Sequence, residues 1–303
     1  MKRILTGLIG IVIVVGVVVT GSYGLSQENI EIYESAVALQ NKMDEIGFDG
    51  FTFTDYPLAF YDGERDYVIT WEGDTYHITK RKALINFIAA TAYPVENHYE
   101  VHTPTVEKMS SLVGLLGAGD GSYGKQNHIA TLWHEAFHCY QLTNFLSNIE
   151  DICPIEVEES VIAEKVDTNE QAVELFKKQA ALLEEAVKSD NIDKVRECIV
   201  QYKELATQRE ALLFEEANYL EEYYTTVEGT ACYIEACVWK MQQPEKVTTD
   251  YVESISIYGG GTGKYYKIGM AQCMILDKLK PDWKQGYDFS RPVVELIYEE
   301  LEI

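Results

Sequence analysis

The segment TLWHEAFHCYQ, residues 131 to 141, places two histidines four residues apart with a glutamate directly after the first. This spacing has a chemical meaning only on an α-helix, where residues i and i+4 lie on one face a single turn apart. There His134 and His138 can direct imidazole nitrogens at one metal ion. Glu135, about 100° further round the helix, lies beside the ion and suits a base acting on metal-activated water. Apolar residues surround the motif and nothing interrupts it between Asn127 and Leu146, so this range is predicted to be a buried helix.

A catalytic zinc site needs a third protein ligand and leaves a fourth position open for water. The best candidate is Glu228, in the segment TTVEGTACYIEA at residues 225 to 236. It lies in a long apolar-periodic stretch that is predicted to form one buried helix or two nearly continuous ones. Gly229 has no side chain, so we expect it to let this helix approach the histidine helix closely. The alternative is an ordinary helix whose two histidines bind no metal.

The two segments together resemble the gluzincin metallopeptidases, the thermolysin-like and aminopeptidase-like enzymes with a His-Glu-x-x-His helix and a glutamate ligand on a following helix. VEGTACYIE is similar to the Glu-Gly-x-Ala-x-Tyr-x-Glu segment of many of them. The resemblance implies a zincin-like fold, with Zn²⁺ held by His134, His138 and Glu228 and with Glu135 as general base. It covers only these two segments.

This chain departs from the family pattern in two places. Residues 139–227 separate the second histidine from Glu228, which implies an insertion. Thermolysin-like enzymes also carry an acid four residues after the third ligand, where this chain has Cys232. Glu235, two turns along the same helix, either supports the site from behind the ligands or is a solvated helix glutamate.

The insertion itself is predicted to be a helical hairpin over residues 167–210. Thr168 to Gln171 resemble a capping box that opens a helix ending near Lys188. Ser189 to Asp193 then provide a turn into a second helix. Such a hairpin either shapes the substrate cleft or braces the fold.

A tyrosine is a further candidate for the site, because in gluzincins a phenol or imidazole often donates to the oxyanion of the reaction. Tyr266 follows a glycine-rich loop and begins the predicted helix YYKIGMAQCMILDKLK. Tyr258 and Tyr265 compete for the same role, and simple packing is the alternative for each.

The predicted fold class is α+β, a small antiparallel β-sheet followed by a mostly α-helical zincin-like metallopeptidase domain over residues 25–303. The expected parts are a helix and β-meander within 27–110, an edge strand and the histidine helix within 111–147, and the Glu228 helix with C-terminal helices within 211–303. The meander has three strands in Phe51 to Thr79, turning at Asp62-Gly63 and at Glu72 to Asp74, and His98 to Pro104 is a candidate extension. The edge strand is expected around Leu112 to Ala118.

Residues 1–24 differ in character from the rest. Lys2 and Arg3 precede an uncharged run from Ile4 to Gly21, which is typical of a signal peptide or an N-terminal membrane anchor. The positive-inside rule then places the following residues outside the cell, either on the extracellular face of the membrane or secreted.

The formal net charge is −24, which disfavours nucleic acid and anionic surfaces as partners. We therefore expect a peptide or protein substrate, and contact with membrane through the N-terminal segment only. An exported chain with six cysteines permits disulfides, but apolar neighbours favour buried thiols for most of them.

The sequence thus predicts an exported zinc-dependent metallopeptidase. Two alternatives stay open: a zinc hydrolase acting on a non-peptide amide, and a non-catalytic metal-binding module on the cell surface.

Overall fold

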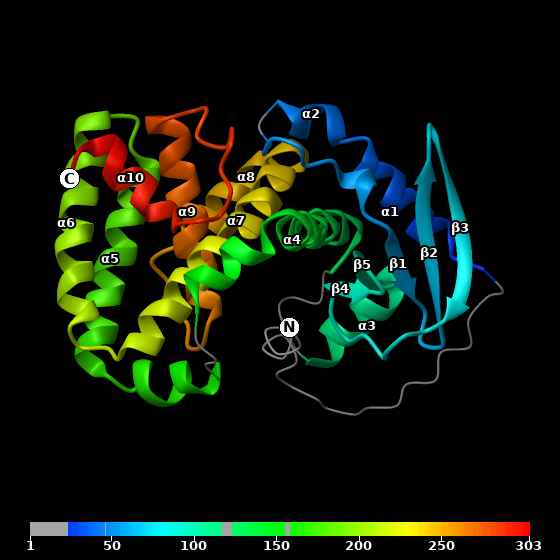
Figure 1. The fold of residues 1–303 in the computed structure, drawn as a ribbon, viewed down its shortest axis with the longest axis horizontal. Coiled ribbons are helices and arrows are strands. Elements are labelled where there is room, and N and C mark those ends of the chain that lie inside the picture. Colours follow the sequence, from blue (N-terminus) through cyan, green and yellow to red (C-terminus); the bar gives the residue numbers. More distant parts are fainter. Residues whose placement is uncertain (1–23, 46, 117–122, 155–157) are drawn as a thin grey trace. The chain divides into compact units, whose positions relative to one another are not determined.

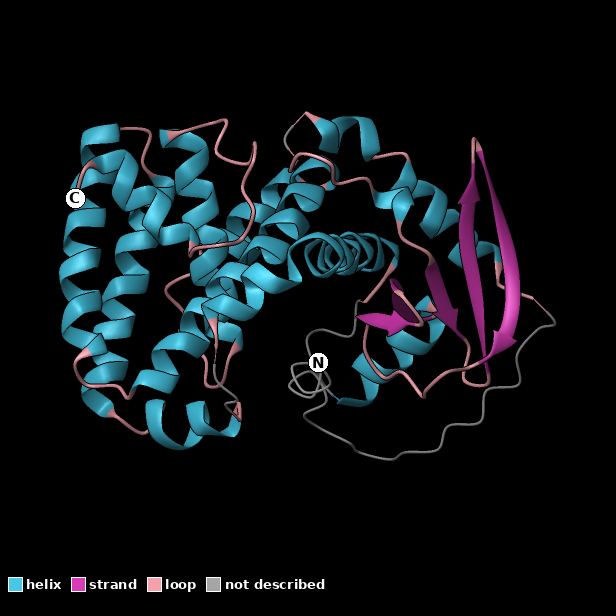
Figure 2. Cartoon of the chain, viewed as in Figure 1, coloured by secondary structure: helices cyan, strands magenta, loops and turns pink. Residues whose placement is uncertain are grey.

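The computed structural model describes residues 24–45, 47–116, 123–154 and 158–303. It is a mixed α+β structure, mostly helical, with one five-stranded sheet among the described residues (Figures 1 and 2). The predicted α+β class, with a small sheet and a mostly helical remainder, is therefore confirmed. The chain divides into two compact units, which we call the sheet unit (described residues within 24–144, and 237–242) and the helical unit (described residues within 145–236, and 243–303).

The sheet has the strand order β3-β2-β1-β5-β4. Its strands are β1 (Leu58–Tyr61), β2 (Arg65–Glu72), β3 (Thr75–Lys82), β4 (Thr91–Val95) and β5 (His98–Pro104). The β1-β2-β3 meander is antiparallel, as predicted, and turns at two glycines with positive φ, Gly63 at 115° and Gly73 at 61°. The extension at β5 is also confirmed, although β5 pairs in parallel with β1. Strand β4, antiparallel to β5, was not predicted.

The helix predicted ahead of the meander, within residues 27–110, is present as α1 (Gln27–Val37) and α2 (Gln40–Asp44), with Ala38 and Leu39 between them. The Ser26 side chain caps α1 by accepting from the Asn29 amide. A 3₁₀ turn, Phe53–Asp55, precedes β1. Its Phe53 stacks on Trp133 with ring centroids 4.8 Å apart, and the indole of Trp133 donates to the Ala36 carbonyl at 3.1 Å. These contacts pack α1 against the histidine helix.

The edge strand predicted around Leu112 to Ala118 is wrong over its described part, because residues 106–116 form helix α3 (Val106–Leu116). A short apolar run such as LVGLL fits a strand or a helix equally well. The deciding contact comes from outside the run: the Asn29 side chain accepts from the Val106 amide at 2.9 Å, one of the donors that a helix start leaves unsatisfied. Residues 117 and 118 lie outside the described residues.

The helical unit contains the predicted hairpin, as α5 (Glu170–Lys188) and α6 (Ile192–Glu210). The cap of α5 is Asn169, whose side chain accepts from the Ala172 amide at 3.1 Å, rather than the expected Thr168. The remaining elements are α7 (Glu215–Gln242), α8 (Pro244–Lys246), α9 (Gly263–Leu279), α10 (Val293–Leu301), and the π-helical turns Ile162–Val166 and Val247–Val252.

Two features from the sequence concern export. Residues 1–23 of the predicted signal peptide or anchor lie outside the described residues, and no helix in the described part is long and apolar enough to cross a membrane. None of the six cysteines forms a disulfide bond, and all but Cys153 are buried.

Candidate metal centre

The predicted histidine helix is confirmed as α4 (Lys125–Ile152), which is longer than expected at both ends. Its core face holds Leu132, Trp133 and Phe137, all with 0% exposure. Aromatic contacts fix this face: Phe51 lies edge-on to both Trp133 and Phe137, with centroids 5.6 and 5.1 Å away. The backbone leaves helical geometry at Phe145, where φ is −131° and ψ is 17°. The histidine pair therefore lies on the regular, tightly packed part of the helix.

His134 and His138 direct the same ring nitrogen at each other. Their Nε2 atoms are 3.0 Å apart, and their ring planes are inclined by 74°. Two nitrogens bound at roughly 2.0–2.1 Å to one tetrahedral zinc ion would be about 3.3 Å apart. The observed separation is close to that value, so the pair fits a shared metal ion.

Gln141 holds the His138 ring in place, and this role was not predicted from the sequence. Its Oε1 atom lies 2.7 Å from Nδ1 of His138, and both side chains are buried. Because an amide oxygen only accepts, Nδ1 must carry the hydrogen, which leaves the Nε2 lone pair of neutral His138 available to a metal. The signal was present in the sequence as a polar residue three positions after a ligand histidine, on the same helix face.

Glu228 lies on α7 and is 4% exposed. An ionised carboxylate at that burial requires a cation or hydrogen-bond donors. The ligand atoms of His134, His138 and Glu228 lie within 4.8 Å of one another, and these three side chains are a group that could hold a metal ion. Among the described residues no other set of three His, Cys, Asp or Glu side chains meets this criterion. Two nitrogens and one oxygen are a donor set that catalytic zinc sites use.

Glu135 is half-buried on α4, next to the first histidine. Cys139 lies one turn further along the helix. Burial raises the pKa of its thiol well above the usual value, and the carboxylates of Glu135 and Glu100 raise that pKa further. Glu135 does not belong to the three-residue group, so its carboxylate would not have to bind a metal held there and would suit proton transfer.

Gly229 makes a close contact with helix α9, whereas the sequence led us to expect an approach to the histidine helix. A Cβ atom at Gly229 would lie 2.5 Å from Cα of Gly269, and a Cβ atom at Gly269 would lie 1.8 Å from the carbonyl oxygen of Thr225. Helices α7 and α9 therefore meet backbone to backbone, one residue after Glu228. This contact fixes α7 at the level of the proposed ligand.

Of the three candidate tyrosines, Tyr266 is half-buried in the first turn of α9, with its ring stacked on Tyr224 at 6.0 Å. Tyr258 donates its hydroxyl to Asp167 at 2.6 Å. Tyr265 is fully buried, and its hydroxyl makes no hydrogen bond to any described residue. The hydroxyl of Tyr258 is thus engaged by Asp167, and that of Tyr265 is buried in the helical unit. Tyr266 stays the candidate donor to the oxyanion.

Glu235, expected either to support the site from behind the ligands or to be a solvated helix glutamate, accepts a hydrogen bond from the Tyr251 hydroxyl at 2.6 Å. Burial raises the pKa of Tyr251, and the charge of Glu235 raises it further, so the phenol keeps its proton and remains a donor. Glu235 is not a member of the three-residue group.

No protein-family model, no curated protein and no solved structure matches this chain.

Proposed function

We propose that the chain is an exported zinc-dependent metallopeptidase of the gluzincin type, in which His134, His138 and Glu228 bind Zn²⁺. The observation that carries the proposal is the pair of Nε2 atoms 3.0 Å apart, with His138 oriented from behind by Gln141. A buried carboxylate in the same ligand group supplies the third donor. Zinc in this set would act as a Lewis acid that activates water and polarises a substrate carbonyl.

The residues of the chain divide the remaining work. Glu135 takes the proton of the attacking water and delivers it to the nitrogen of the leaving amine, because it lies beside the ligands on the same helix and is not one of them. Tyr266 donates its phenol hydrogen to the oxygen that becomes negatively charged when the carbonyl is attacked. The negative charge of the chain favours cationic peptides in diffusional encounter.

One specific observation separates this function from the non-catalytic metal-binding module. A structural zinc site is closed by four protein ligands. The group found among the described residues has three, and a second acid, Glu135, lies next to a ligand without belonging to the group. A zinc hydrolase acting on a non-peptide amide would use the same residues, so the choice of substrate distinguishes it.

The test measures metal and turnover separately on the full chain. Zinc per mole is measured at limiting metal, alongside hydrolysis of a peptide pool, for wild type, Glu228→Ala and Glu135→Gln. We expect Glu228→Ala to lose most of its zinc, and Glu135→Gln to keep zinc and lose turnover, because a base is needed for reaction and not for binding. Full zinc occupancy in Glu228→Ala would remove Glu228 from the ligand set, with Glu235 as the next candidate. Turnover of amide compounds but of no peptide in the pool would favour the non-peptide hydrolase.

A further inference from the structure

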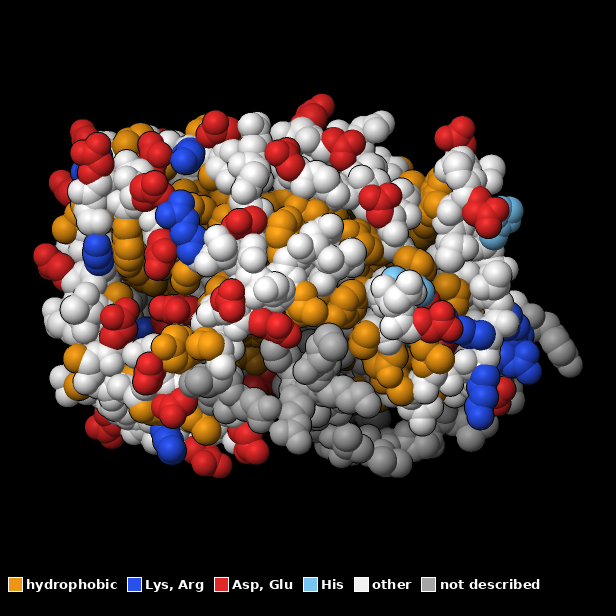
Figure 3. All heavy atoms as spheres, in the orientation of Figure 1, with side chains coloured by type: hydrophobic (Ala, Val, Ile, Leu, Met, Phe, Trp, Pro, Cys, Tyr) orange, Lys and Arg blue, Asp and Glu red, His pale blue; other side chains and the backbone are white. Residues whose placement is uncertain are grey.

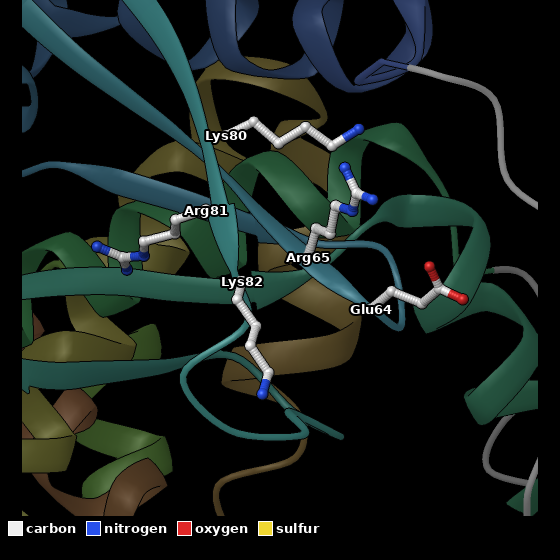
Figure 4. Close-up of a pocket in the computed structure, with 5 residues that line it drawn as sticks. All are labelled: Glu64, Arg65, Lys80, Arg81 and Lys82. Carbon is white, nitrogen blue, oxygen red and sulfur yellow. The ribbon is translucent and has the colours of Figure 1, made fainter.

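An open pocket at one end of the β2-β3 hairpin gathers positive charge in an acidic protein. The pocket has a volume of about 390 Å³ and is lined by one acid and four bases: Glu64, Arg65, Lys80, Arg81 and Lys82 (Figure 4). The whole chain has 49 acidic and 25 basic residues. Such a local excess of cations, against the sign of the net charge, points to an anionic partner.

Three of these cations are available to a partner. Arg81 is engaged inside the sheet unit, where its guanidinium lies 2.5 Å from Glu100 and 3.3 Å from Asp66. Arg65, Lys80 and Lys82 make no ion pair with any residue that the structure describes.

Their side chains also share a face of the sheet. Arg65 pairs directly with Lys82 across the β2-β3 ladder, and Tyr67 pairs with Lys80. Paired residues of antiparallel strands project to the same side, and alternate residues along one strand do so too. Lys80 accordingly lies over the Tyr67 ring, with Nζ 5.1 Å from its centroid. The three cations therefore lie on one face at this end of the sheet, where Figure 4 shows Lys80 and Arg65 side by side and Lys82 pointing away from them.

Exposed apolar side chains flank the basic residues of β3 in the chain, with Ile78 before them and Leu84, Ile85 and Ile88 after them. Ile78 is 39% exposed, Leu84 44%, Ile85 37% and Ile88 54%, and these are four of the eight large hydrophobic residues that the described part of the chain exposes. Figure 3 shows blue side chains over this end of the hairpin beside an orange patch. An apolar patch rimmed by lysine and arginine is the composition of surfaces that enter the headgroup region of a bilayer.

The apolar segment is held in this exposed position by contacts at its start and middle. The Ala83 amide donates to the Glu64 carbonyl at 3.3 Å, and the Leu84 amide donates to the Asp66 side chain at 3.3 Å. Phe87 is 4% exposed and packs edge-on against Tyr93 at 5.4 Å. The segment is therefore anchored by one buried ring, and its neighbours face solvent.

We propose that Arg65, Lys80 and Lys82, together with Leu84, Ile85 and Ile88, form a docking surface for a membrane that carries anionic lipid headgroups. Lipid phosphates would pair with these three cations, and the acyl chains next to the headgroups would contact the adjacent isoleucine and leucine side chains. An acidic polypeptide would satisfy the cations and leave these apolar side chains in water. The negative charge elsewhere on the chain is repelled by the same membrane, so this surface would set the orientation of the sheet unit. It would be a second membrane contact, beside the N-terminal segment that the sequence predicts as the only one.

The path of the chain agrees with such an orientation. Ser26, just before α1, donates to Glu107 at 2.6 Å, and the neighbouring Lys108 lies over the Tyr61 ring at 4.7 Å. Tyr61 ends β1, at the same end of the sheet where β2 begins with Arg65. Ser26, which follows the predicted membrane segment in the sequence, is thus linked through α3 to the end of the sheet that carries the cations. The inference does not depend on the proposed zinc chemistry.

The test is amide hydrogen exchange of the full chain on phosphatidylcholine nanodiscs with and without phosphatidylglycerol. Residues 78–90 are expected to exchange more slowly only on the anionic discs. Each basic residue near an anionic surface strengthens binding by about five-fold, so the triple variant Arg65→Ala, Lys80→Ala, Lys82→Ala should lose on the order of 100-fold of this protection. The control triple Lys42→Ala, Lys178→Ala, Lys280→Ala has the same charge change on exposed sites and should keep it.

Two further arms decide the class of partner. The variant Leu84→Ser, Ile88→Ser should reduce protection on anionic discs, because it removes apolar contacts and leaves every charge in place. Equal exchange of residues 78–90 on both kinds of disc would overturn the proposal. Polyglutamate that protects these residues as well as the anionic discs do, with no effect of the serine variant, would also overturn it and assign the surface to an acidic polypeptide.

Discussion

Gln141 Oε1 accepts a hydrogen bond from His138 Nδ1 at 2.7 Å, deep in the core of α4. The bond fixes both the ring orientation and the tautomer of His138, so the Nε2 atom that faces His134 is the one able to bind a metal. An outer hydrogen bond of this kind typically contributes 10- to 100-fold to metal affinity.

Gln141→Leu keeps the size of the side chain and removes the acceptor. We expect the zinc dissociation constant to rise by about 10- to 100-fold, measured by competition with a chromophoric chelator. Gln141→Glu retains an acceptor at the same reach and is expected to hold zinc at least as tightly as wild type. An unchanged dissociation constant in the leucine variant would show that Gln141 does not support the site.

Tyr266→Phe is expected to lower kcat by about 10²-fold, the scale for losing one donor to a developing oxyanion, and to leave zinc content unchanged. Tyr265→Phe is the matched control on the same helix, because its hydroxyl is buried without a hydrogen bond to a described residue. Steady-state kinetics on one peptide substrate compares the two. Equal rates for wild type and Tyr266→Phe would exclude Tyr266 from the reaction.

Gly269→Ala is expected to lower the free energy of unfolding by roughly 3 kcal/mol, because its Cβ would lie 1.8 Å from the Thr225 carbonyl oxygen and force α7 and α9 apart. Gly114→Ala on α3 is the control. A Cβ there meets nothing within 4 Å, so alanine should stabilise the helix by about 0.5–1 kcal/mol. Urea unfolding of both variants measures the difference, and a Gly269→Ala protein as stable as wild type would contradict the backbone contact.

The buried cluster around Glu100 predicts a pH dependence of stability. Burial acts to raise the pKa of Glu100, but hydrogen bonds from His102 and Arg81 outweigh it and lower the pKa from 4.5 to about 2. The ionised carboxylate therefore stabilises the fold above about pH 4.5, and this contribution is lost as the pH falls towards 2.

Glu100→Gln should consequently cost about 2 kcal/mol more at pH 7 than at pH 3, measured by urea unfolding of variant and wild type at each pH. Glu204→Gln, on an exposed position of α6, is the control for general charge effects. A penalty for Glu100→Gln that is the same at both pH values would mean that the carboxylate charge does not stabilise this cluster.

The parts of this fold that the sequence predicted are those where local signals agree. The meander was predictable because turn residues, Asp62-Gly63 and Glu72-Gly73-Asp74, lie between segments of alternating polarity. The helical hairpin was predictable because its first helix is strongly amphipathic and has capping residues, Asn169 and Ser189, at its ends. Strand β4 was missed because Pro94 lies inside it, and proline argues against a strand unless the strand is at an edge.

The errors occurred where a distant residue decides the outcome. Asn29 accepts from the Val106 amide and helps to make residues 106–116 a helix, across a separation that no local pattern reports. Gly269 explains why Gly229 is a glycine, and it is 40 positions away in the sequence, from 229 to 269. At the candidate site, the two histidines among the proposed ligands follow from their spacing on one helix. The role of Gln141 depends on the direction of its side chain, which the sequence does not give.

The absence of disulfides among the six cysteines has a consequence for how the chain matures. An exported protein with disulfide bonds reaches its native state only after its cysteines are oxidised and incorrect pairs are rearranged, which takes seconds to hours. Under the proposed export, this chain would need no such step, and its five buried thiols would be shielded from extracellular oxidants once packing is complete. If both proposals hold, maturation would be governed by collapse of the apolar core and by the supply of the proposed metal, and it would proceed in the same way in reducing and oxidising surroundings.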